Sequence, residues 1–257
     1  MQAKKVLGQN FLTDKNKVNE IIESIPNLED STVIEVGPGL GAITFPLSDK
    51  ASKVTAIEID SDMIDILEEK NKPNLKVINK DILAVTWDEV IEQGEGNINF
   101  VSNLPYYIST KIMFKVASDK RFATMSVMLQ KELVDRIFAK TNTKQFGRLT
   151  VAINSLYELI KRIDVPATCF TPKPNVESGF IVLRRKDTDF DVDEYLNFIK
   201  SCFANKRKTI MNSIKNSGSY NRDKLTEIFN EMEIPLNIRA EQIEVQTYIE
   251  IWKKYNK

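Results

Sequence analysis

The sequence predicts an α/β protein whose parallel sheet is covered by helices on both faces. Two observations support this fold class. Short runs rich in β-branched residues alternate with helical patterns up to residue 185, and the first run ends in a glycine-rich turn. From Val192 onward only helical patterns continue. We therefore expect two domains, a sheet-containing domain at residues 1–187 and a small all-helical domain at residues 188–257.

The expected strands and helices follow from hydrophobic periodicity. Alternating or wholly apolar runs predict strands at residues 32–37, 53–60, 75–81, 98–103, 124–130 and 179–185. Amphipathic patterns predict helices at residues 14–25, 61–71 and 109–118. In sheets of this class, ligands bind beyond the carboxyl ends of the parallel strands. The residues that end these strands are therefore the first candidates for a functional site.

Composition excludes several classes of protein. Of the 257 residues 42% are hydrophobic, yet no apolar run reaches the roughly 18 residues that a membrane span needs. The N-terminal segment is basic and lacks the apolar core of a signal peptide. Histidine is absent, which removes histidine acid–base catalysis and most zinc sites, and Cys169 and Cys202 lack metal-binding spacing. We expect a cytoplasmic protein with reduced thiols, no metal and no membrane contact.

The net charge is zero, but the charges are unevenly distributed. Residues 18–103 carry six basic and seventeen acidic side chains, a net −11, whereas residues 104–148 carry nine basic and three acidic ones, a net +6. A local patch, rather than the mean charge, attracts phosphate. Two basic groups are candidates for gripping an RNA backbone, and a solvated surface is the alternative for each. They are Arg136, Lys140, Lys144 and Arg148, and Lys206, Arg207 and Lys208.

The segment IEVGPGLGAIT at residues 34–44 places glycines at positions 37, 39 and 41, between a predicted strand and a helix. Glycines there permit a tight turn and let a ligand approach the backbone closely. Ala42 stands where the third glycine of the dinucleotide-binding motif would be, so that motif is not matched. Gly37 and Gly39 are candidate contacts for a different ligand, and a purely structural turn is the alternative.

Acidic residues end the next two predicted strands. Glu58 lies near the end of the second strand, and Asp81 ends the third. A carboxylate at the first position can accept hydrogen bonds from both hydroxyls of a ribose, and one at the second from an adenine amino group. Asp60 competes with Glu58 for the ribose role, and capping of a helix is the alternative for each acid. With the glycine turn, these acids predict a site for an adenine nucleoside.

The fourth predicted strand ends in Asn103-Leu104-Pro105-Tyr106, which suits chemistry on a planar amine. The Asn103 side-chain oxygen and the Leu104 carbonyl can accept the two N–H bonds of an exocyclic amine and orient its lone pair. Pro105 fixes the turn that directs this carbonyl inward, and Tyr106 offers a ring on which a base stacks. A methyl donor such as S-adenosylmethionine would present its sulfonium here, and in-line transfer needs no histidine. These four residues are the predicted catalytic residues.

The blocks of this sequence resemble the ribosomal RNA adenine N6-dimethyltransferases, most closely the KsgA type that acts on small-subunit rRNA. The resemblance runs nearly end to end. The matching blocks, in order, are LGQNFLTD (7–14), IEVGPGLGAIT (34–44), NLPYYIST (103–110), MLQKELVDRI (128–137), FGRLTV (146–151), FTPKPNVES (170–178) and NKRKTIMNSI (205–214). The related Erm enzymes, which modify large-subunit rRNA, share the first three blocks, and the later blocks favour the KsgA type.

The resemblance implies a class I S-adenosylmethionine-dependent methyltransferase with a Rossmann-like, mostly parallel seven-stranded sheet and a helical C-terminal domain that binds RNA. It implies a monomer that dimethylates two adjacent adenosines in the 3′-terminal hairpin loop of 16S rRNA, within the immature small subunit, and releases S-adenosylhomocysteine. It implies that Tyr106 and Phe170 hold the target adenine between two rings. The cofactor contacts that it implies are Asn10, Leu12, Gly37, Glu58, Asp81 and Asn103.

Several alternatives concern the substrate and individual residues. An Erm-like enzyme on large-subunit rRNA is the second hypothesis, and an RNA-binding assembly factor without catalysis is the third, against which the intact site acids and Asn103 argue. Asn10 and Leu12 are expected to fold over the cofactor, with a free arm as the alternative. Relatives usually carry Asn or His where this chain carries Tyr107. The Tyr107 ring can pack beneath the Asn-Leu-Pro-Tyr turn or lie beside the substrate, and we favour the first.

Overall fold

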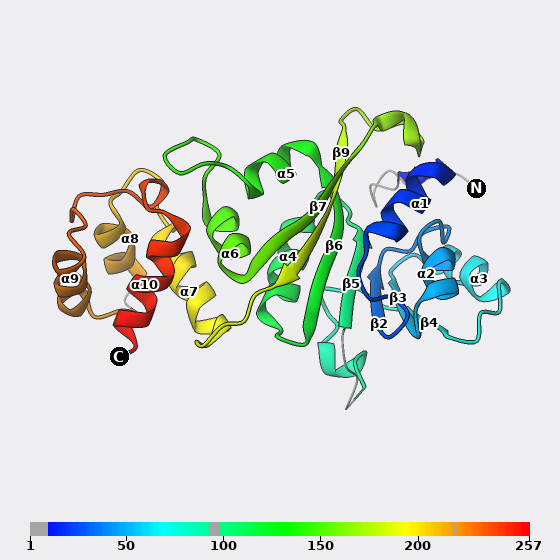
Figure 1. Ribbon diagram of the computed structural model, residues 1–257, viewed down its shortest axis with the longest axis horizontal. Coiled ribbons are helices and arrows are strands. Elements are labelled where there is room, and N and C mark those ends of the chain that lie inside the picture. Colours follow the sequence, from blue (N-terminus) through cyan, green and yellow to red (C-terminus); the bar gives the residue numbers. More distant parts are fainter. Residues whose placement is uncertain (1–9, 93–97, 218) are drawn as a thin grey trace. The chain divides into compact units, whose positions relative to one another are not determined.

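The computed structural model describes residues 10–92, 98–217 and 219–257. The chain divides into two compact units, which Figure 1 shows in sequence colours. The first unit contains Met1–Val134 and Glu158–Arg185, and the second contains Asp135–Tyr157 and Lys186–Lys257. The sequence predicted one boundary at residues 187 and 188, whereas here the segment 135–157 groups with the C-terminal helices. No helix within the described ranges is long and apolar enough to cross a membrane.

A seven-stranded sheet in the order β4-β3-β2-β5-β6-β9-β7 forms the centre of the first unit. Neighbouring strands from β4 to β6 pair in parallel, and β9 runs antiparallel to β6. The predicted mostly parallel α/β sheet is therefore confirmed. The strands are β2 (Thr32–Val36), β3 (Lys53–Glu58), β4 (Leu75–Asn79), β5 (Ile98–Asn103), β6 (Phe122–Gln130), β7 (Tyr157–Val165) and β9 (Ser178–Arg185).

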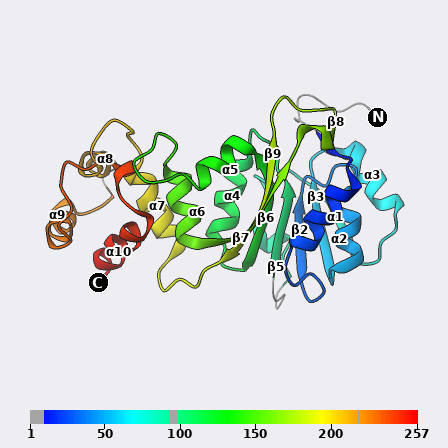
Figure 2. The ribbon, with the colours of Figure 1, turned by 45° about the horizontal axis from the view of Figure 1, so that its top comes forward.

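One face of the sheet packs against α1 (Lys15–Ser24) and α2 (Thr44–Lys50), which lie side by side (Figure 2). Ile21 of α1 and Leu47 of α2 belong to the same buried apolar cluster as Val101 of β5. Successive side chains of a strand point to opposite faces, so one set of alternate residues meets these helices. The apolar periodicity of the strands thus gives this face an apolar surface, which α1 and α2 cover.

The opposite face carries an aromatic cluster beneath α4 (Ser109–Ser118) and the short 3₁₀ helix η2 (Trp87–Glu89). Phe100 precedes Val101 in β5, so its side chain points to this opposite face. Its ring packs edge-on against Trp87, with the ring centroids 6.3 Å apart. Phe122 completes the cluster, with its centroid 4.7 Å from that of Trp87. The indole N–H of Trp87 donates to the Lys115 carbonyl of α4, 3.1 Å away. Both faces of the sheet are therefore covered, as predicted.

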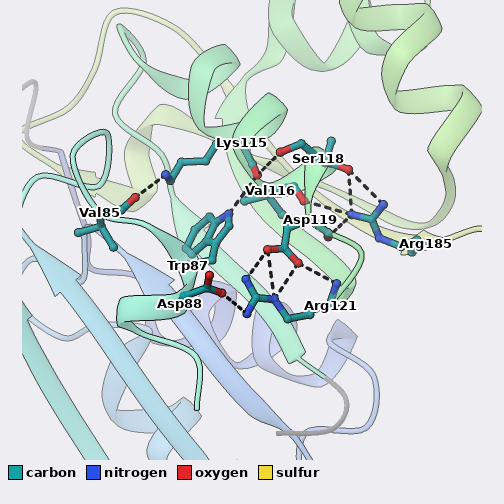
Figure 3. A network of polar contacts seen from close by, with 10 residues as sticks. Val85, Trp87, Asp88, Lys115, Val116, Ser118, Asp119, Arg121 and Arg185 are labelled. Carbon is teal, nitrogen blue, oxygen red and sulfur yellow. Dashed lines mark hydrogen bonds and ion pairs between the residues drawn. The ribbon is translucent and has the colours of Figure 1, made fainter. Parts of the chain in front are cut away.

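Arg185, the last residue of β9, holds the C-terminal end of α4 (Figure 3). Its guanidinium donates hydrogen bonds to the carbonyls of Val116, Ala117 and Asp119, at 2.8–3.1 Å. A further bond of 2.8 Å reaches the Phe122 carbonyl. The last carbonyls of a helix have no partner within the helix, so this one side chain satisfies several of them. Arg185 therefore fixes α4 against the sheet.

The N-terminal segment docks on the first unit through a two-stranded ribbon. Strand β1 (Phe11–Leu12) pairs antiparallel with β8 (Phe170–Thr171). The Thr13 N–H donates to the carbonyl of Cys169, at the end of η3 (Ala167–Cys169), over 2.8 Å. The described part of this segment is therefore anchored, and the alternative of a free arm is wrong for it. The prediction for residues 1–9 lies outside the described residues.

The second unit is helical, as the sequence predicted for its C-terminal part. Helix α6 packs against α7 and α10, and the hydroxyls of Ser155 and Tyr195 share a buried hydrogen bond of 2.7 Å between α6 and α7. This packing explains why α6 groups with the later helices. α5 (Lys131–Ile137) spans the boundary between the units. The helices of the second unit are α6 (Arg148–Leu156), α7 (Val192–Cys202), α8 (Ile210–Ser217), α9 (Arg222–Glu231) and α10 (Val245–Tyr255).

Candidate active site

A cavity in the first unit opens beyond the carboxyl ends of the parallel strands. Its walls come from β1, the glycine turn after β2, and the ends of β3, β4 and β5. This is where ligands bind in sheets of this kind. The structure brings together ten of the predicted cofactor and catalytic residues. Those that line the cavity are Asn10, Leu12, Gly37, Gly39, Glu58, Asp81, Asn103, Leu104, Pro105 and Tyr106.

The glycine turn needs its glycines for two physical reasons. Gly37 has a φ of +69° and Gly39 a φ of +54°, backbone conformations that residues other than glycine rarely adopt. A Cβ atom on Gly39 would also stand 3.2 Å from the Phe11 ring. The Gly37 N–H donates to the Ile57 carbonyl at 3.0 Å, which fixes the turn to the neighbouring strand β3. The turn is therefore preformed, with the Phe11 ring close above it.

Glu58 is the buried acid that ends β3 at the cavity wall. Its Oε2 accepts from the N–H of Gly39 at 3.1 Å, and its Oε1 accepts from the N–H of Asp60 at 2.9 Å. Burial raises the pKa of the Glu58 carboxyl, and these two N–H groups oppose that shift. Asp60 instead caps α3 (Ser61–Glu69) by accepting from the Asp62 N–H. Helix capping therefore occupies Asp60, and Glu58 faces the cavity.

The part of the cavity wall beyond β3 and β4 combines an acid with apolar side chains. Asp81 is exposed, and its Oδ1 accepts from the Leu83 N–H at 2.8 Å. Leu83 and Ile59 are both exposed apolar residues of this wall. Lys80 of the same wall pairs with Glu89. A planar ring bound here would find apolar side chains beside an acceptor for an amino group.

Glu35 is a site residue that the sequence interpretation left without a role. It lines the cavity from β2 with only 2% of its surface exposed, and its Oε2 has no hydrogen-bond partner among the described residues. Burial, together with the neighbouring charge of Glu58, raises the pKa of Glu35 to about 8. The signal was available, because an acid interrupts the apolar strand TVIEV.

The turn after β5 holds its polar groups in place through three neighbours. The Asn103 Nδ2 donates to the Asn10 carbonyl at 3.3 Å, which leaves the side-chain oxygen as an acceptor. The Leu104 N–H donates to the Met128 carbonyl at 3.2 Å, and the Leu104 side chain is buried. The Tyr106 hydroxyl shares a hydrogen bond of 3.1 Å with Ser178, a residue that the sequence interpretation did not single out.

Two aromatic residues differ from what the sequence favoured or implied. Tyr107 is 61% exposed at the cavity wall, so the expectation that its ring packs beneath the turn is wrong. Phe170 is 4% exposed, belongs to the apolar core of the first unit and is not among the residues that line the cavity. Phe170 is held there by its own pairing with Leu12 of β1. Stacking of Phe170 on a base stays a prediction, and it requires the ring to become accessible.

Both basic groups predicted from the sequence lie in the second unit. The members with exposed side chains are Arg136, Lys140, Lys144, Lys206, Arg207 and Lys208. Arg148 is half-buried, and burial lowers its pKa. Residues 239–241 tie the two groups together, because Asn142 donates to the Glu241 carbonyl at 2.7 Å and Thr209 forms a β-bridge with Arg239. Arg239 is exposed and adds a basic residue that the sequence interpretation missed.

The fold and the cavity together define a class of protein. The sheet is mostly parallel, a preformed glycine turn follows β2, and an acid ends the neighbouring strand β3. Among the described residues, the wall carries the acids Glu58 and Asp81 against one lysine, Lys80, and this acidic balance suits a cationic nucleoside. These are the features of a class I S-adenosylmethionine-dependent methyltransferase.

Comparison with known proteins identifies the family. The family described as "Ribosomal RNA adenine dimethylase" matches residues 1–257, so the chain belongs to it. "Ribosomal RNA small subunit methyltransferase A" of Mycoplasma mobile is 37% identical over 249 residues, 95% of each chain. The protein of the same name from Bacillus thuringiensis is 39% identical over 259 residues, 95% of this chain and 88% of that relative.

Solved structures support the same fold. A dimethyladenosine transferase from Plasmodium falciparum matches with a TM-score of 0.79 and 23% identity, over 96% of this chain and 97% of that chain. The 23S rRNA methyltransferase ErmE matches with a TM-score of 0.69 and 25% identity, over 96% of this chain and 100% of that chain. The family match and the curated relatives make the chain an rRNA adenine dimethyltransferase that uses S-adenosylmethionine.

Proposed function

We propose that this enzyme dimethylates the N6 amino groups of two adjacent adenosines in the 3′-terminal hairpin loop of 16S rRNA, during biogenesis of the small ribosomal subunit. The observation that carries the proposal is one cavity that joins the nucleoside-binding acids to the turn of Asn103 and Tyr106. The relatives at 37% and 39% identity bear the name of a small-subunit methyltransferase, which supports the choice of rRNA. We infer a monomer that acts on the immature subunit in the cytoplasm.

The residues around the glycine turn are proposed to hold the methyl donor. S-adenosylmethionine, when bound, supplies a methyl group on a cationic sulfur. Glu58 keeps free lone pairs on both carboxylate oxygens, which can accept from the two ribose hydroxyls. Asp81 accepts from the adenine amino group, and the apolar side chains of Ile59 and Leu83 flank the ring. Asn10 and Leu12 cover the cavity and exclude water from it.

The turn after β5 is proposed to hold the target amine. The Asn103 oxygen and the Leu104 carbonyl accept its two N–H bonds, which draws the nitrogen toward tetrahedral geometry and aims its lone pair at the methyl group. The hydrogen bond of the Asn103 nitrogen to the Asn10 carbonyl fixes the amide in this orientation. Pro105 sets the direction of the Leu104 carbonyl. Tyr106 supports the base by stacking, and Phe170 is the proposed second ring.

The second unit is proposed to bind the rRNA backbone. The exposed basic side chains within residues 136–148 and 206–208 contact phosphates through their charge and do not contact bases. Such contacts release counterions, so the affinity falls as the salt concentration rises. They carry no sequence information, and the choice of adenosine depends on the cavity and on the shape of the rRNA.

Methyl transfer to purified ribosomal subunits tests the proposal. Undermethylated small subunits and large subunits are each incubated with the enzyme and S-adenosylmethionine labelled in its methyl group. We expect label on adenine N6 of the small subunit only. Asn103→Ala should abolish transfer and leave RNA affinity nearly unchanged, because it removes one amine acceptor but no phosphate contact. Label on large-subunit rRNA would favour the Erm-like alternative, and cofactor binding without any transfer would favour an assembly factor.

A further inference from the structure

We propose that Ser178 is a positioning residue for methyl transfer, whose hydroxyl fixes the Tyr106 ring against which the target adenine stacks. The proposal deepens the function proposed above and rests on it. Ser178 is not among the residues that line the cavity, so we place it behind the site rather than in contact with the reacting groups. It acts through the hydrogen bond of 3.1 Å between the two hydroxyls.

The strand register explains how residues 72 positions apart come to meet. Asn103, the last residue of β5, pairs with Met128 of β6, which pairs with Phe180 of β9. The strand β6 continues for two residues beyond this point, to Gln130, which pairs with Ser178. Ser178 therefore lies beyond the carboxyl end of β5, where the chain turns through Tyr106. The sheet itself places a hydroxyl within reach of the ring.

Ser178 is a fixed anchor, whereas Tyr106 lies in a turn. Ser178 is 1% exposed and begins β9. The residue before it is held twice, since the Glu177 carbonyl accepts from the Lys131 N–H and the Glu177 carboxylate accepts from the Ala167 N–H, both at 2.9 Å. The hydroxyl of Tyr106 thus joins a turn to a paired strand, and this hydrogen bond restricts rotation of the ring.

This anchoring explains what a tyrosine does here that a phenylalanine cannot. Stacking needs only the ring, which both residues offer. In-line transfer also requires the amine to be held at the right distance and angle, and small misplacements of a reacting group lower the rate strongly. A freely rotating ring would still bind the base but would hold the amine less well. Loss of the anchor should therefore lower kcat more than it raises KM for RNA.

The test combines Ser178→Ala, Tyr106→Phe and the double variant. Each single variant should lower kcat about 10-fold, with KM for RNA and affinity for S-adenosylmethionine changed less than about 3-fold. The double variant should be no slower than either single one, because all three lose the same hydrogen bond. Ser48→Ala is the matched control, since Ser48 is buried and its hydroxyl bonds to its own helix at the Thr44 carbonyl, so kcat should stay unchanged.

A fluorescent base reports on the ring directly. An RNA hairpin with 2-aminopurine in place of one of two adjacent loop adenines should be quenched on binding to the wild type and less quenched by Ser178→Ala. The proposal would be overturned if Ser178→Ala left both kcat and the fluorescence quenching unchanged. It would also be overturned if the fold-losses in kcat of the two single variants multiplied in the double variant. If Ser178→Ala fails to fold, Tyr106→Phe still removes the bond from the other side. A wild type that methylates no rRNA would instead refute the proposed function.

Discussion

Replacing the buried acid Glu35 by glutamine should stabilise the cofactor-free protein at neutral pH. In the unfolded chain this carboxyl ionises near its usual pKa of 4.5, whereas in the folded protein its pKa is about 8. Between these values the folded state holds a proton that the unfolded state has lost, so stability falls as the pH rises. The slope is about 1.4 kcal/mol per pH unit, which amounts to about 3 kcal/mol at pH 7. Glutamine stays neutral and avoids this loss.

Denaturant unfolding between pH 5 and about pH 9 measures the effect, with no cofactor present. The stability of Glu35→Gln relative to the wild type should grow as the pH rises and level off above about pH 8, where the folded wild type ionises as well. Glu29→Gln is the control, because Glu29 is exposed and its replacement should leave the pH dependence unchanged. Parallel curves for the wild type and Glu35→Gln would refute the reasoning and show that Glu35 is ionised inside the cavity.

The remaining predictions concern the cofactor, the RNA and the fold. Glu58→Gln should weaken S-adenosylmethionine binding about 10-fold or more by calorimetry, since the amide offers one acceptor oxygen instead of two; equal affinity would remove Glu58 from the site. Arg207→Ala with Lys208→Ala should weaken binding to rRNA and flatten its dependence on salt, and an unchanged salt slope would speak against phosphate contacts. Arg185→Ala should lower the unfolding free energy by about 3 kcal/mol, because several carbonyls at the end of α4 lose their donor. The control is Arg184→Ala at the exposed neighbouring residue, which should lower it by less than about 1 kcal/mol. Similar losses in both variants would contradict the capping role of Arg185.

The part of the fold that the sequence predicts well is the part with clear periodicity. The strands β2, β3, β5, β6 and β9 are mostly buried and apolar, so their patterns are strong. Strand β4 has no buried residue, and its pattern is weaker. Strand β7 shows a much weaker pattern, because residues 158–162 are all exposed and only Tyr157, Ile163 and Val165 are buried. The resemblance to the family, and not the periodicity, predicted the seventh strand.

Tertiary packing decided two features that no local pattern shows. Helix α6 groups with the C-terminal helices because of packing that includes the bond between Ser155 and Tyr195, which joins residues 40 positions apart. Composition along the chain predicts domains that are single uninterrupted segments. It therefore cannot show that the segment 135–157 groups with residues 186–257. Likewise, exposure of the Tyr107 ring depends on how the turn sits against the cavity wall, which the letters Tyr-Tyr do not specify.

That the candidate site residues gather at one cavity was predictable where they stand at strand ends, whereas their roles stay predictions. Glu58, Asp81 and Asn103 meet because the carboxyl ends of neighbouring parallel strands lie at one edge of the sheet. Ser178 could not be found in this way, since it begins an antiparallel strand and its partner is set by the register with β6. Supporting contacts of this kind require the pairing of strands, which the sequence alone leaves open.

The methylation state of rRNA in cells that lack this gene tests the central claim most directly. Mass spectrometry of small-subunit and large-subunit rRNA, from the parent strain and the deletion strain, measures dimethyladenosine at each site. The account predicts that two adjacent adenosines near the 3′ end of 16S rRNA lose both methyl groups, and that the gene restores them while its Asn103→Ala variant does not. Unchanged marks at those two positions, or a loss confined to large-subunit rRNA, would contradict it.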